Sequence, residues 1–292
     1  MTVGRLVILA GGISSRMKKF DVIKEKIDPH LIDDANLKAK SMIGVGDNYR
    51  PFLDYLLYNA REAGYADVLI VIGEKDKSVK SYYGIKDKNN NFHGLNISYA
   101  VQKIPSGRVK PAGTADALYQ GLITKKEWKG KKFTVCNSDN LYSQKALSIM
   151  LNIKYPNAMI GYNRDALEFE ISRIEKFAIT VRNSEGYLVD IIEKPTKGEM
   201  ERLRIKNGVL VVSMNIFCLN YDHILRYLNT LPYHPVRKEK ELPMAIKMMI
   251  KENSKSVFAY PLSEHVPDLT DKDDIIPVKK YLKKYFTHPL FE

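Results

Sequence analysis

LVILAGGISSRMKK (residues 6–19) is the stretch that decides how this chain begins its fold. Five apolar or small residues, typical of a buried strand, run into Gly11 and Gly12. Serines, Arg16, a methionine and two lysines follow them. Glycine lets the backbone approach a ligand closely and adopt φ > 0, so its N–H groups can face phosphate oxygens. The stretch therefore predicts either a phosphate-binding loop or a plain glycine turn at a sheet edge.

The residues after the glycines strengthen the phosphate hypothesis. A helix beginning there would add its N-terminal dipole, and the guanidinium of Arg16 could hold two oxygens at once. Other phosphate motifs are missing: there is no GxxxxGK[ST], and GVGDNY (residues 44–49) lacks the third glycine of a dinucleotide loop. The sequence therefore disfavours a Walker-type ATPase and a dinucleotide-binding protein.

Composition excludes several classes of protein. The chain has 292 residues, 45% of them hydrophobic, and no apolar run approaches the ~20 residues that span a bilayer. We therefore expect a cytoplasmic protein with a full core. A net charge of +12 attracts polyanions, but the lysines are scattered and no aromatic platforms interleave with them, so nucleic acid is not the expected partner. Cys136 and Cys218 lie in apolar runs and are predicted to be buried thiols.

Short apolar runs alternate with helical periodicity in the first half of the chain. Strands are predicted over 5–10, 68–73, 96–101 and 132–137, and helices over 52–60, 75–83 and 114–122. Thr114 is the expected N-cap of the last of these helices. The second half predicts a hairpin around NSEG, strands over 208–219 and 256–261, helices over 221–229 and 239–252, and a final amphipathic segment over 271–285. We therefore expect one α/β domain over 1–292, with a mostly parallel central sheet and helices on both faces.

Seven segments in order give the chain a family resemblance. LAGGISSRMKK (9–19) resembles the L-A-(G/A)-G-x-x-(S/T)-R signature of the sugar-1-phosphate nucleotidyltransferases. Further pieces similar to this family lie at 40–57, 101–118, 135–140, 191–195, 212–219 and 266–275. The resemblance implies a Rossmann-like GT-A-type nucleotidyltransferase fold with a mixed sheet. It also implies a nucleotide-binding half (1–150) and a sugar-phosphate-binding half (151–292).

The same resemblance implies roles for individual residues. The nucleotide would be bound by Leu9, Ala10, Gly11, Gly12, Lys40, Gln102, Gly113 and Thr114. The sugar phosphate would be bound by Asn140, Glu193, Lys194 and Asn215. The implied catalytic residues are Arg16, Lys194 and Asp139, and the implied ligands of one Mg²⁺ are Asp139 and Asp268. The implied reaction condenses a nucleoside triphosphate with a sugar 1-phosphate and releases pyrophosphate.

Chemistry supports this residue set independently of the family. Attack of a phosphate oxygen on the α-phosphorus gathers negative charges, so catalysis consists mainly of positioning and neutralisation. Mg²⁺ typically takes one or two carboxylates, with water and phosphate as its other ligands. No histidine cluster suggests a zinc site instead.

Each assignment has a structural alternative. Asp139 could cap a helix beginning near Ser143, and Asp268 could cap a helix in DLTDKDD (268–274). Glu193 and Lys194 could form a surface ion pair. Gln102 could be an ordinary surface residue at a strand end.

The chain also departs from the family pattern. The segment 20–39 is longer than usual, and would be a lid, an oligomer contact or a tolerated insertion. It makes Lys38 a rival for Lys40. Ser138 stands where a glycine is usual, and SGRVKP (106–111) is inserted before Gly113, so the base is left open. Two other functions stay open: a non-catalytic nucleotide-sugar-binding regulator, and a nucleotidyltransferase for a non-sugar phosphate such as phosphocholine. Homo-oligomerisation is also left open.

Overall fold

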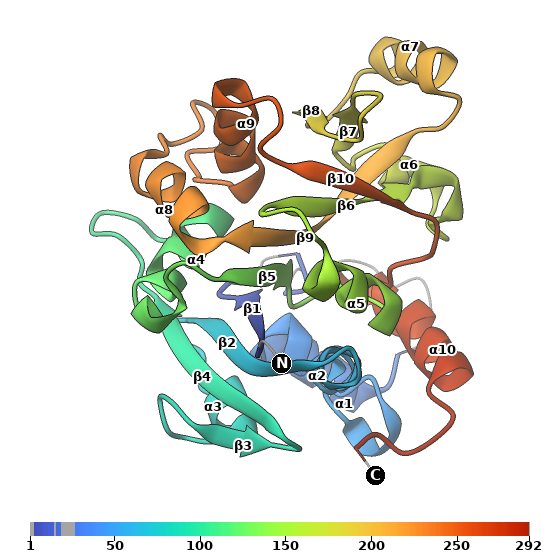
Figure 1. Ribbon diagram of the computed structural model, residues 1–292. Helices are drawn as coiled ribbons and strands as arrows, with labels where there is room; N and C mark the ends of the chain where they lie inside the picture. Colours follow the sequence, from blue (N-terminus) through green and yellow to red (C-terminus); the bar gives the residue numbers. More distant parts are fainter. Residues whose placement is uncertain (1–2, 15, 19–26, 292) are drawn as a thin grey trace.

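A single β-sheet joins both halves of the chain (Figure 1). The computed structural model describes residues 3–14, 16–18 and 27–291, without the side chains of 205–207. The strands are β1 (Gly4–Ala10), β2 (Tyr65–Gly73), β3 (Asn90–Phe92), β4 (Leu95–Gln102), β5 (Lys132–Asn137), β6 (Ala158–Asn163), β7 (Ile179–Arg182), β8 (Leu188–Ile192), β9 (Val211–Asn220) and β10 (Phe258–Leu262). Their order is β10-β6-β9-β5-β1-β2-β4-β3, with β7 joined to β9 and β8 joined to β7.

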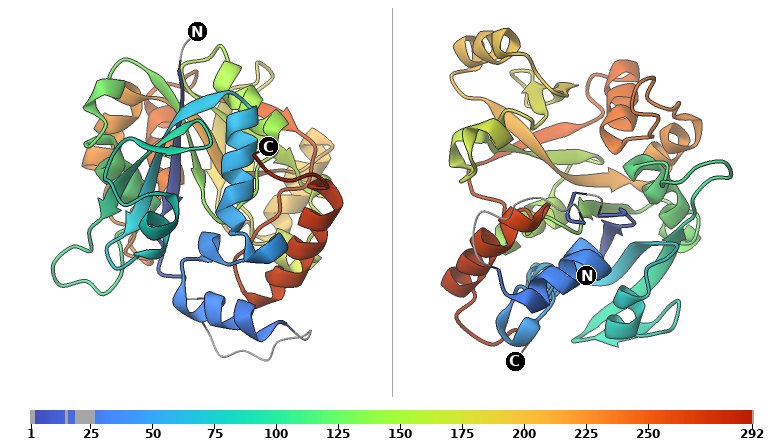
Figure 2. Two further views of the ribbon diagram at one scale, coloured as in Figure 1. Left: turned by 90° about the horizontal axis from the view of Figure 1, so that it is seen from below. Right: turned by 180° about the vertical axis from the view of Figure 1, so that it is seen from behind.

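Helices cover both faces of this sheet (Figure 2). They are α1 (Pro29–Leu37), α2 (Phe52–Glu62), α3 (Ser78–Tyr83), α4 (Thr114–Leu122), α5 (Gln144–Asn152), α6 (Ile171–Ile174), α7 (Lys197–Asn207), α8 (Tyr221–Thr230), α9 (Leu242–Glu252) and α10 (Ile275–Tyr285). None of these helices in the described ranges combines the length and apolarity needed to cross a membrane. The predicted α/β class and mostly parallel sheet are confirmed.

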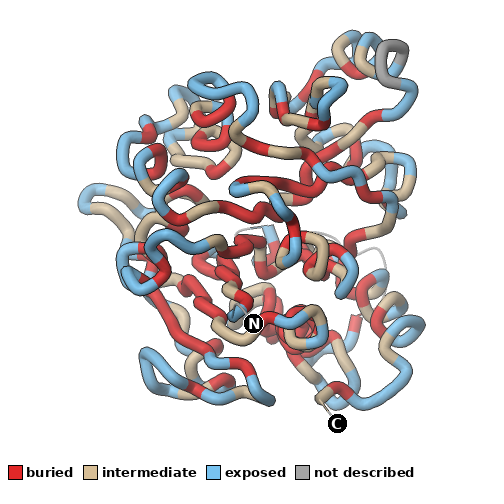
Figure 3. Tube along the Cα trace, in the orientation of Figure 1, coloured by how far each residue is buried: buried red, intermediate tan, exposed pale blue. Residues whose placement is uncertain are grey.

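Strand β1 is buried on both of its faces. Leu6 and Ile8 belong to the core shared with α2, α5 and α10, whereas Val7 and Leu9 belong to the core shared with α4, α8 and α9. Figure 3 shows buried residues concentrated along the central strands. A strand covered on both faces reads as a continuous apolar run, which is why this stretch is apolar throughout.

The chain changes direction across the sheet next to β1. Strand β1 is parallel to β2 on one side and to β5 on the other. Leu9 faces Asn137 across β1 and β5, and the Ser138 N–H donates to the Leu9 carbonyl at 3.2 Å. Where successive strands are added on opposite sides of one parallel strand, the loops at their carboxyl ends diverge and leave a crevice. The loops after β1 and β5 therefore meet at one edge.

Strand β9 is interrupted by a bulge. It pairs antiparallel with β5 and β6, and its register against β6 shifts between the pairs Met159–Phe217 and Gly161–Ser213. Asn215 lies inside this shift with φ of 57°. The strand predicted over 208–219 is found as β9, and the bulge turns residue 215 out of its regular ladder.

Most predicted elements are found within a few residues of their predicted bounds, with two corrections at helix starts. Thr114 is not an N-cap: Gly113 holds that position, and the Thr114 hydroxyl accepts from the Leu242 N–H at 2.9 Å. Asp139 does not cap α5, because Ser143 caps it by accepting from the Ala146 N–H at 3.0 Å. Both cysteines are buried free thiols, as predicted.

The long segment before Lys40 is partly helical. Residues 19–26 lie outside the described residues. In the remainder, α1 buries Leu31 and Ala35 against the core. The carboxylate of buried Asp34 accepts from the Gly44 N–H at 3.0 Å. The described part of this segment is therefore attached to the domain by both apolar and polar contacts.

The bulge in β9 provides a stability test. The hydroxyl of Tyr142, which is fully buried, donates to the Met214 carbonyl at 2.6 Å. Tyr142→Phe leaves that carbonyl without its partner, and we expect a loss of about 1–3 kcal/mol in the free energy of unfolding. Urea denaturation measures this loss.

Tyr162→Phe is the matched control. Tyr162 is equally buried, but its hydroxyl makes no hydrogen bond with the described residues. Its removal should leave stability unchanged or slightly raised. Equal losses in the two variants would show that the Tyr142 hydrogen bond does not hold the bulge.

Candidate functional site

Two adjoining cavities open where the loops after β1 and β5 meet. The glycine-loop cavity, about 360 Å³, is lined by all eight residues predicted for the nucleotide: Leu9, Ala10, Gly11, Gly12, Lys40, Gln102, Gly113 and Thr114. The aspartate cavity, about 710 Å³, is lined by Asn140, Asn215 and Asp268 among the predicted residues. Arg16, Asn137 and Asp139 line both. The structure thus brings most of the predicted set to one edge of the sheet.

The two glycines of the loop meet different constraints. A Cβ at Gly11 would lie 2.6 Å from the Gln102 side-chain oxygen, whereas a Cβ at Gly12 would meet nothing within 4 Å. Neither glycine has a positive φ; Ser14 does, at 55°. The loop therefore does not use the left-handed region that glycine permits at these two positions. A side chain at position 11 would instead have to displace the Gln102 amide.

No helix follows the loop in residues 11–14 and 16–18. Instead, the Lys18 N–H donates to the Ser14 carbonyl at 3.1 Å, which closes a turn. A helix dipole therefore does not contribute at these residues. Arg16 is exposed and lines both cavities.

Gln102 joins the glycine loop to the start of α4. It is buried, and its amide nitrogen donates to the Gly113 carbonyl at 2.9 Å and to Asp116 Oδ2 at 3.0 Å. Gln102 is thus not an ordinary surface residue. Because both amide N–H groups are engaged, only the side-chain oxygen remains to contact a ligand.

The loop around Gly113 is fixed by the segment before α9. Gly113 has φ of 113°, and a Cβ there would lie 2.5 Å from the Lys240 carbonyl oxygen. That carbonyl accepts from the Ala115 N–H at 2.9 Å. This pairing brings Glu241, which lies in no motif of the sequence, into the wall of the glycine-loop cavity.

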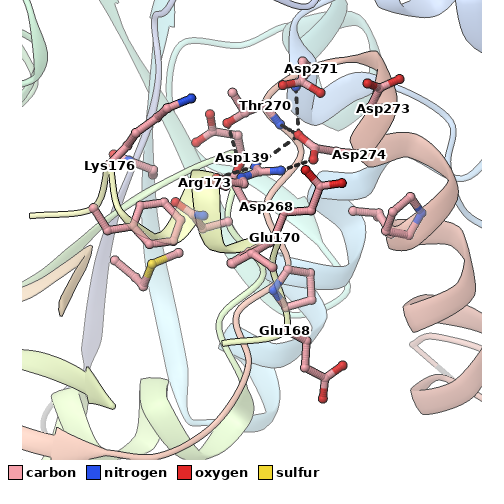
Figure 4. Close-up of a pocket in the computed structure, with 18 of the residues that line it drawn as sticks. Asp139, Glu168, Glu170, Arg173, Lys176, Asp268, Thr270, Asp271, Asp273 and Asp274 are labelled. Atoms are coloured by element: carbon pink, nitrogen blue, oxygen red, sulfur yellow. Dashed lines mark hydrogen bonds and ion pairs between the residues drawn. The ribbon is translucent and has the colours of Figure 1, made fainter. Parts of the chain in front are cut away.

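Asp139 and Asp268 are neighbours. The Leu269 N–H donates to the Asp139 carbonyl at 2.8 Å, and Asn140 forms a β-bridge with Asp268. Burial, and secondly the charge of Asp139, raise the pKa of Asp268 to about 6. Asp268 does not cap the turn that follows it, because Asp271 does. Two acidic residues far apart in sequence therefore come together at the aspartate cavity (Figure 4).

A cation accompanies each of these carboxylates. Lys40 Nζ lies 2.7 Å from Asp139 Oδ2, and the Arg173 guanidinium lies 2.9 Å from Asp268 Oδ2. Lys38, the rival of Lys40, pairs instead with Asp34 at 2.6 Å. The structure therefore distinguishes the two lysines. Arg173 was not selected from the sequence, where no motif surrounds it.

Aromatic rings line the outer part of the aspartate cavity. Phe169 is in edge contact with Phe177 and with His265, whose centroids lie 5.6 and 4.8 Å from its own. Tyr281 lies 5.9 Å beyond His265. Burial lowers the pKa of His265, so the ring is disposed to be neutral. These rings offer apolar faces to a bound molecule.

Two predicted sugar-phosphate residues lie elsewhere. Glu193 lines neither cavity; it forms an ion pair with Arg237 and lines a third hollow, between β8 and α9. Lys194 is exposed with φ of 49° and does not line these cavities. Arg237 also lies 2.7 Å from Glu241 Oε2 and lines the aspartate cavity. Glu193 thus reaches the site only through Arg237, and the structure does not bring Lys194 there.

The described residues contain no group of three or more histidine, cysteine or acidic side chains arranged to hold a metal. A zinc-type site is therefore not found in this part of the chain. The pair Asp139 and Asp268 nevertheless suits Mg²⁺, which typically takes one or two carboxylates.

The fold is similar to that of solved sugar-nucleotide enzymes. A UDP-glucose pyrophosphorylase of Acinetobacter baumannii superposes with a TM-score of 0.70 at 17% identity, covering 99% of this chain and 95% of that one. A glucose-1-phosphate thymidylyltransferase of Bacillus anthracis, described as putative, gives 0.67 at 16% identity and 99% coverage of both chains. At such identities the similarity shows the fold alone.

Sequence relatives are distant and longer. A glucose-1-phosphate adenylyltransferase of Desulforamulus reducens is 23% identical over 269 residues, 90% of this chain and 60% of the relative. The corresponding protein of Thermotoga neapolitana is 24% identical over 260 residues, 87% of this chain and 54% of the relative. The chain therefore spans little more than half the length of these relatives.

The family itself is shown by a match over most of the chain. The model described as nucleotidyl transferase matches residues 35–263. Gly11, Gly12, Arg16 and Asp268 lie outside the matched range, and the structure brings them to the same edge as the matched residues. As the motifs of the sequence implied, the chain belongs to the nucleotidyl transferase family.

Proposed function

We propose that the chain transfers a nucleotidyl group from a nucleoside triphosphate to a sugar 1-phosphate, giving an NDP-sugar and pyrophosphate. One observation carries the proposal: Asp139, which lines both cavities, lies beside Asp268, which lines the aspartate cavity. The glycine-loop cavity would hold the triphosphate and the base. The aspartate cavity would hold the sugar phosphate.

The reaction needs charge neutralisation more than acid–base chemistry. An oxygen of the sugar phosphate attacks the α-phosphorus in line, the bond to the bridging oxygen breaks, and pyrophosphate leaves with the electron pair. The attacking oxygen is already ionised, so no base has to remove a proton. The backbone of the glycine loop, Lys40 and Arg16 would hold the phosphates while this exchange takes place.

The acidic pair fits a resident Mg²⁺. Asp139 and Asp268 are brought together by backbone pairing although their charges repel; burial first, and then the charge of Asp139, raise the pKa of Asp268. These two residues would hold the ion, which when bound supplies positive charge against the α-phosphate and the incoming phosphate. The cost of placing two carboxylates together is offset by such a cation.

A second acceptor class has one observation in its favour. The rings of Phe169, Phe177 and Tyr281 line the aspartate cavity together with Glu168. Aromatic faces and carboxylates attract quaternary ammonium groups, as in phosphocholine. The Arg173 guanidinium already lies over the Phe169 ring, 4.7 Å from its centroid, which leaves less of that ring for a second cation. A sugar phosphate is therefore the first choice.

A pyrophosphate-release assay tests the reaction. The panel combines ATP, UTP, dTTP, GTP and CTP with glucose 1-phosphate, other sugar 1-phosphates and phosphocholine. We expect Mg²⁺-dependent release with at least one sugar 1-phosphate, because Lys40, Arg16 and the glycine loop would hold the phosphates beside the acidic pair. Release with phosphocholine alone would select the second acceptor class. No release from folded protein that still binds a nucleotide sugar would indicate a regulator.

Asp139→Asn tests the acidic pair directly. The amide keeps the shape of the side chain but removes its charge, so turnover should fall by about 100-fold or more. Asp87→Asn is the control, because Asp87 is also ion-paired, to Lys80 at 2.6 Å, but is exposed and lines neither cavity. Steady-state kinetics should separate the two variants; retention of full activity in Asp139→Asn would remove Asp139 from the site.

Glu241, in the wall of the glycine-loop cavity, should make the stability of the protein depend on pH. Burial, and secondly the charge of Glu193, raise the pKa of Glu241 to about 7, although Arg237 opposes the shift. An acid whose folded-state pKa is raised stabilises the fold fully below its ordinary pKa, and this stabilisation is lost as pH rises through 7. Glu241→Gln removes the ionisation. The melting temperature of this variant relative to the parent should therefore be higher at pH 8 than at pH 5.

Glu199→Gln is the control for that measurement. Hydrogen bonds from Thr196 lower the pKa of Glu199, so this carboxylate is ionised at both pH values. Its replacement should shift the melting temperature equally at pH 5 and pH 8. If Glu241→Gln shows the same flat difference, the raised pKa of Glu241 is contradicted.

A further inference from the structure

Arg173 has no role in the proposed reaction as described above, yet it contacts two aspartates of the aspartate cavity. It lies in α6, within the connection between β6 and β7, and its side chain reaches the acidic pair (Figure 4). One guanidinium nitrogen lies 2.9 Å from Asp268 Oδ2 and 3.1 Å from Asp274 Oδ2, and the other contacts Asp274 as well. Arg173 is therefore shared between an expected metal ligand and a second aspartate.

The two aspartates hold Arg173 in different ways. Asp274 makes a two-pronged contact with the guanidinium, and it also accepts from the Thr270 N–H at 2.7 Å and the Asp271 N–H at 2.9 Å. Asp268 makes a single contact with Arg173, and its other oxygen accepts from the Thr270 hydroxyl at 2.5 Å. Asp274 is thus the fixed anchor, whereas the contact with Asp268 can break without loss of the anchor.

The charges around the acidic pair indicate a role for the contact between Arg173 and Asp268. Without a metal, three carboxylates, those of Asp139, Asp268 and Asp274, are paired with the two cations Lys40 and Arg173. A divalent cation at the same carboxylates would lie close to both side-chain cations, and the like charges would repel. Incoming phosphates bring the negative charge that Lys40 and Arg173 can then pair with.

We propose that Arg173 is a displaceable counter-ion of Asp268, which occupies the expected metal ligand until a metal and phosphate arrive. On their arrival the guanidinium leaves Asp268 and stays on Asp274 and over the Phe169 ring, where it faces the aspartate cavity. Arg173 thereby holds the empty site together and makes metal binding without substrate unfavourable. The inference rests on the metal site of the proposed function.

The test measures Mn²⁺ binding to the full chain without nucleotide, by the electron paramagnetic resonance signal of free Mn²⁺. Arg173→Gln removes the competing charge, so we expect Kd to fall about ten-fold, a change of about 1.4 kcal/mol. Arg173→Lys keeps the charge and should bind within about two-fold of the parent, which a purely structural role would not restore. Lys176→Gln is the matched control: Lys176 lines the same cavity, is exposed, and should leave Kd unchanged.

Asp139→Asn separates failure of the inference from failure of the metal site. Loss of Mn²⁺ binding in Asp139→Asn together with tighter binding in Arg173→Gln supports the inference. If Asp139→Asn binds Mn²⁺ like the parent, the metal site itself is wrong. If Asp139→Asn loses binding but Arg173→Gln binds equally or more weakly than the parent, Arg173 is not a competing counter-ion, and the proposed function is unaffected.

Discussion

Backbone pairing between residues 139–141 and 267–269 is the constraint on which the rest of the site depends. Two hydrogen bonds, from Leu269 to Asp139 and from Leu141 to Pro267, fix a short ladder. This ladder places two carboxylates side by side against their mutual repulsion. Side-chain contacts alone would not hold them there, because like charges in a partly buried place separate unless the backbone prevents it.

The negative charge that this ladder brings together is paired with cationic side chains. The protein carries a net charge of +12, yet most of that charge is spread over its surface. Among the described side chains, Lys40 and Arg173 are the cations that form ion pairs with the acidic pair. They are brought there by unrelated segments, one before α2 and one between β6 and β7. Two cations from distant parts of the sequence are thus paired with the two carboxylates.

Much of the site could be predicted from the sequence because its parts are local. The glycine loop, Lys40, Gln102 and Asp139 follow strands or lie in short motifs, and parallel strands bring their carboxyl ends to one edge. Asp268 could be predicted because it lies within the family-like segment 266–275. The predicted helix over 114–122 and strand over 132–137 coincide with α4 and β5. In these places pattern and structure agree because the elements are amphipathic or fully buried.

The remainder could not be predicted because it depends on tertiary contacts. Arg173 and Arg237 lie in connections without periodicity, and only folding brings them to the carboxylates. Lys194 stands in a motif-like stretch, but its left-handed backbone points it to the surface. The bulge at Asn215 could not be predicted, because no residue in the apolar run marks where the register between β9 and β6 shifts. Strand β6 also escaped prediction, since its apolar run is short and follows Pro156.

The position of β9 has a consequence for synthesis on the ribosome. Strands β6 and β10 reach the central strands only through β9, which lies between β5 and β6. A growing chain can therefore assemble β1, β2, β4 and β5 early, but β5 keeps an unpaired edge until β9 has emerged. During that interval the nascent protein exposes an aggregation-prone strand edge. Strands β6 and β10 cannot join the sheet until β9 has paired with β5.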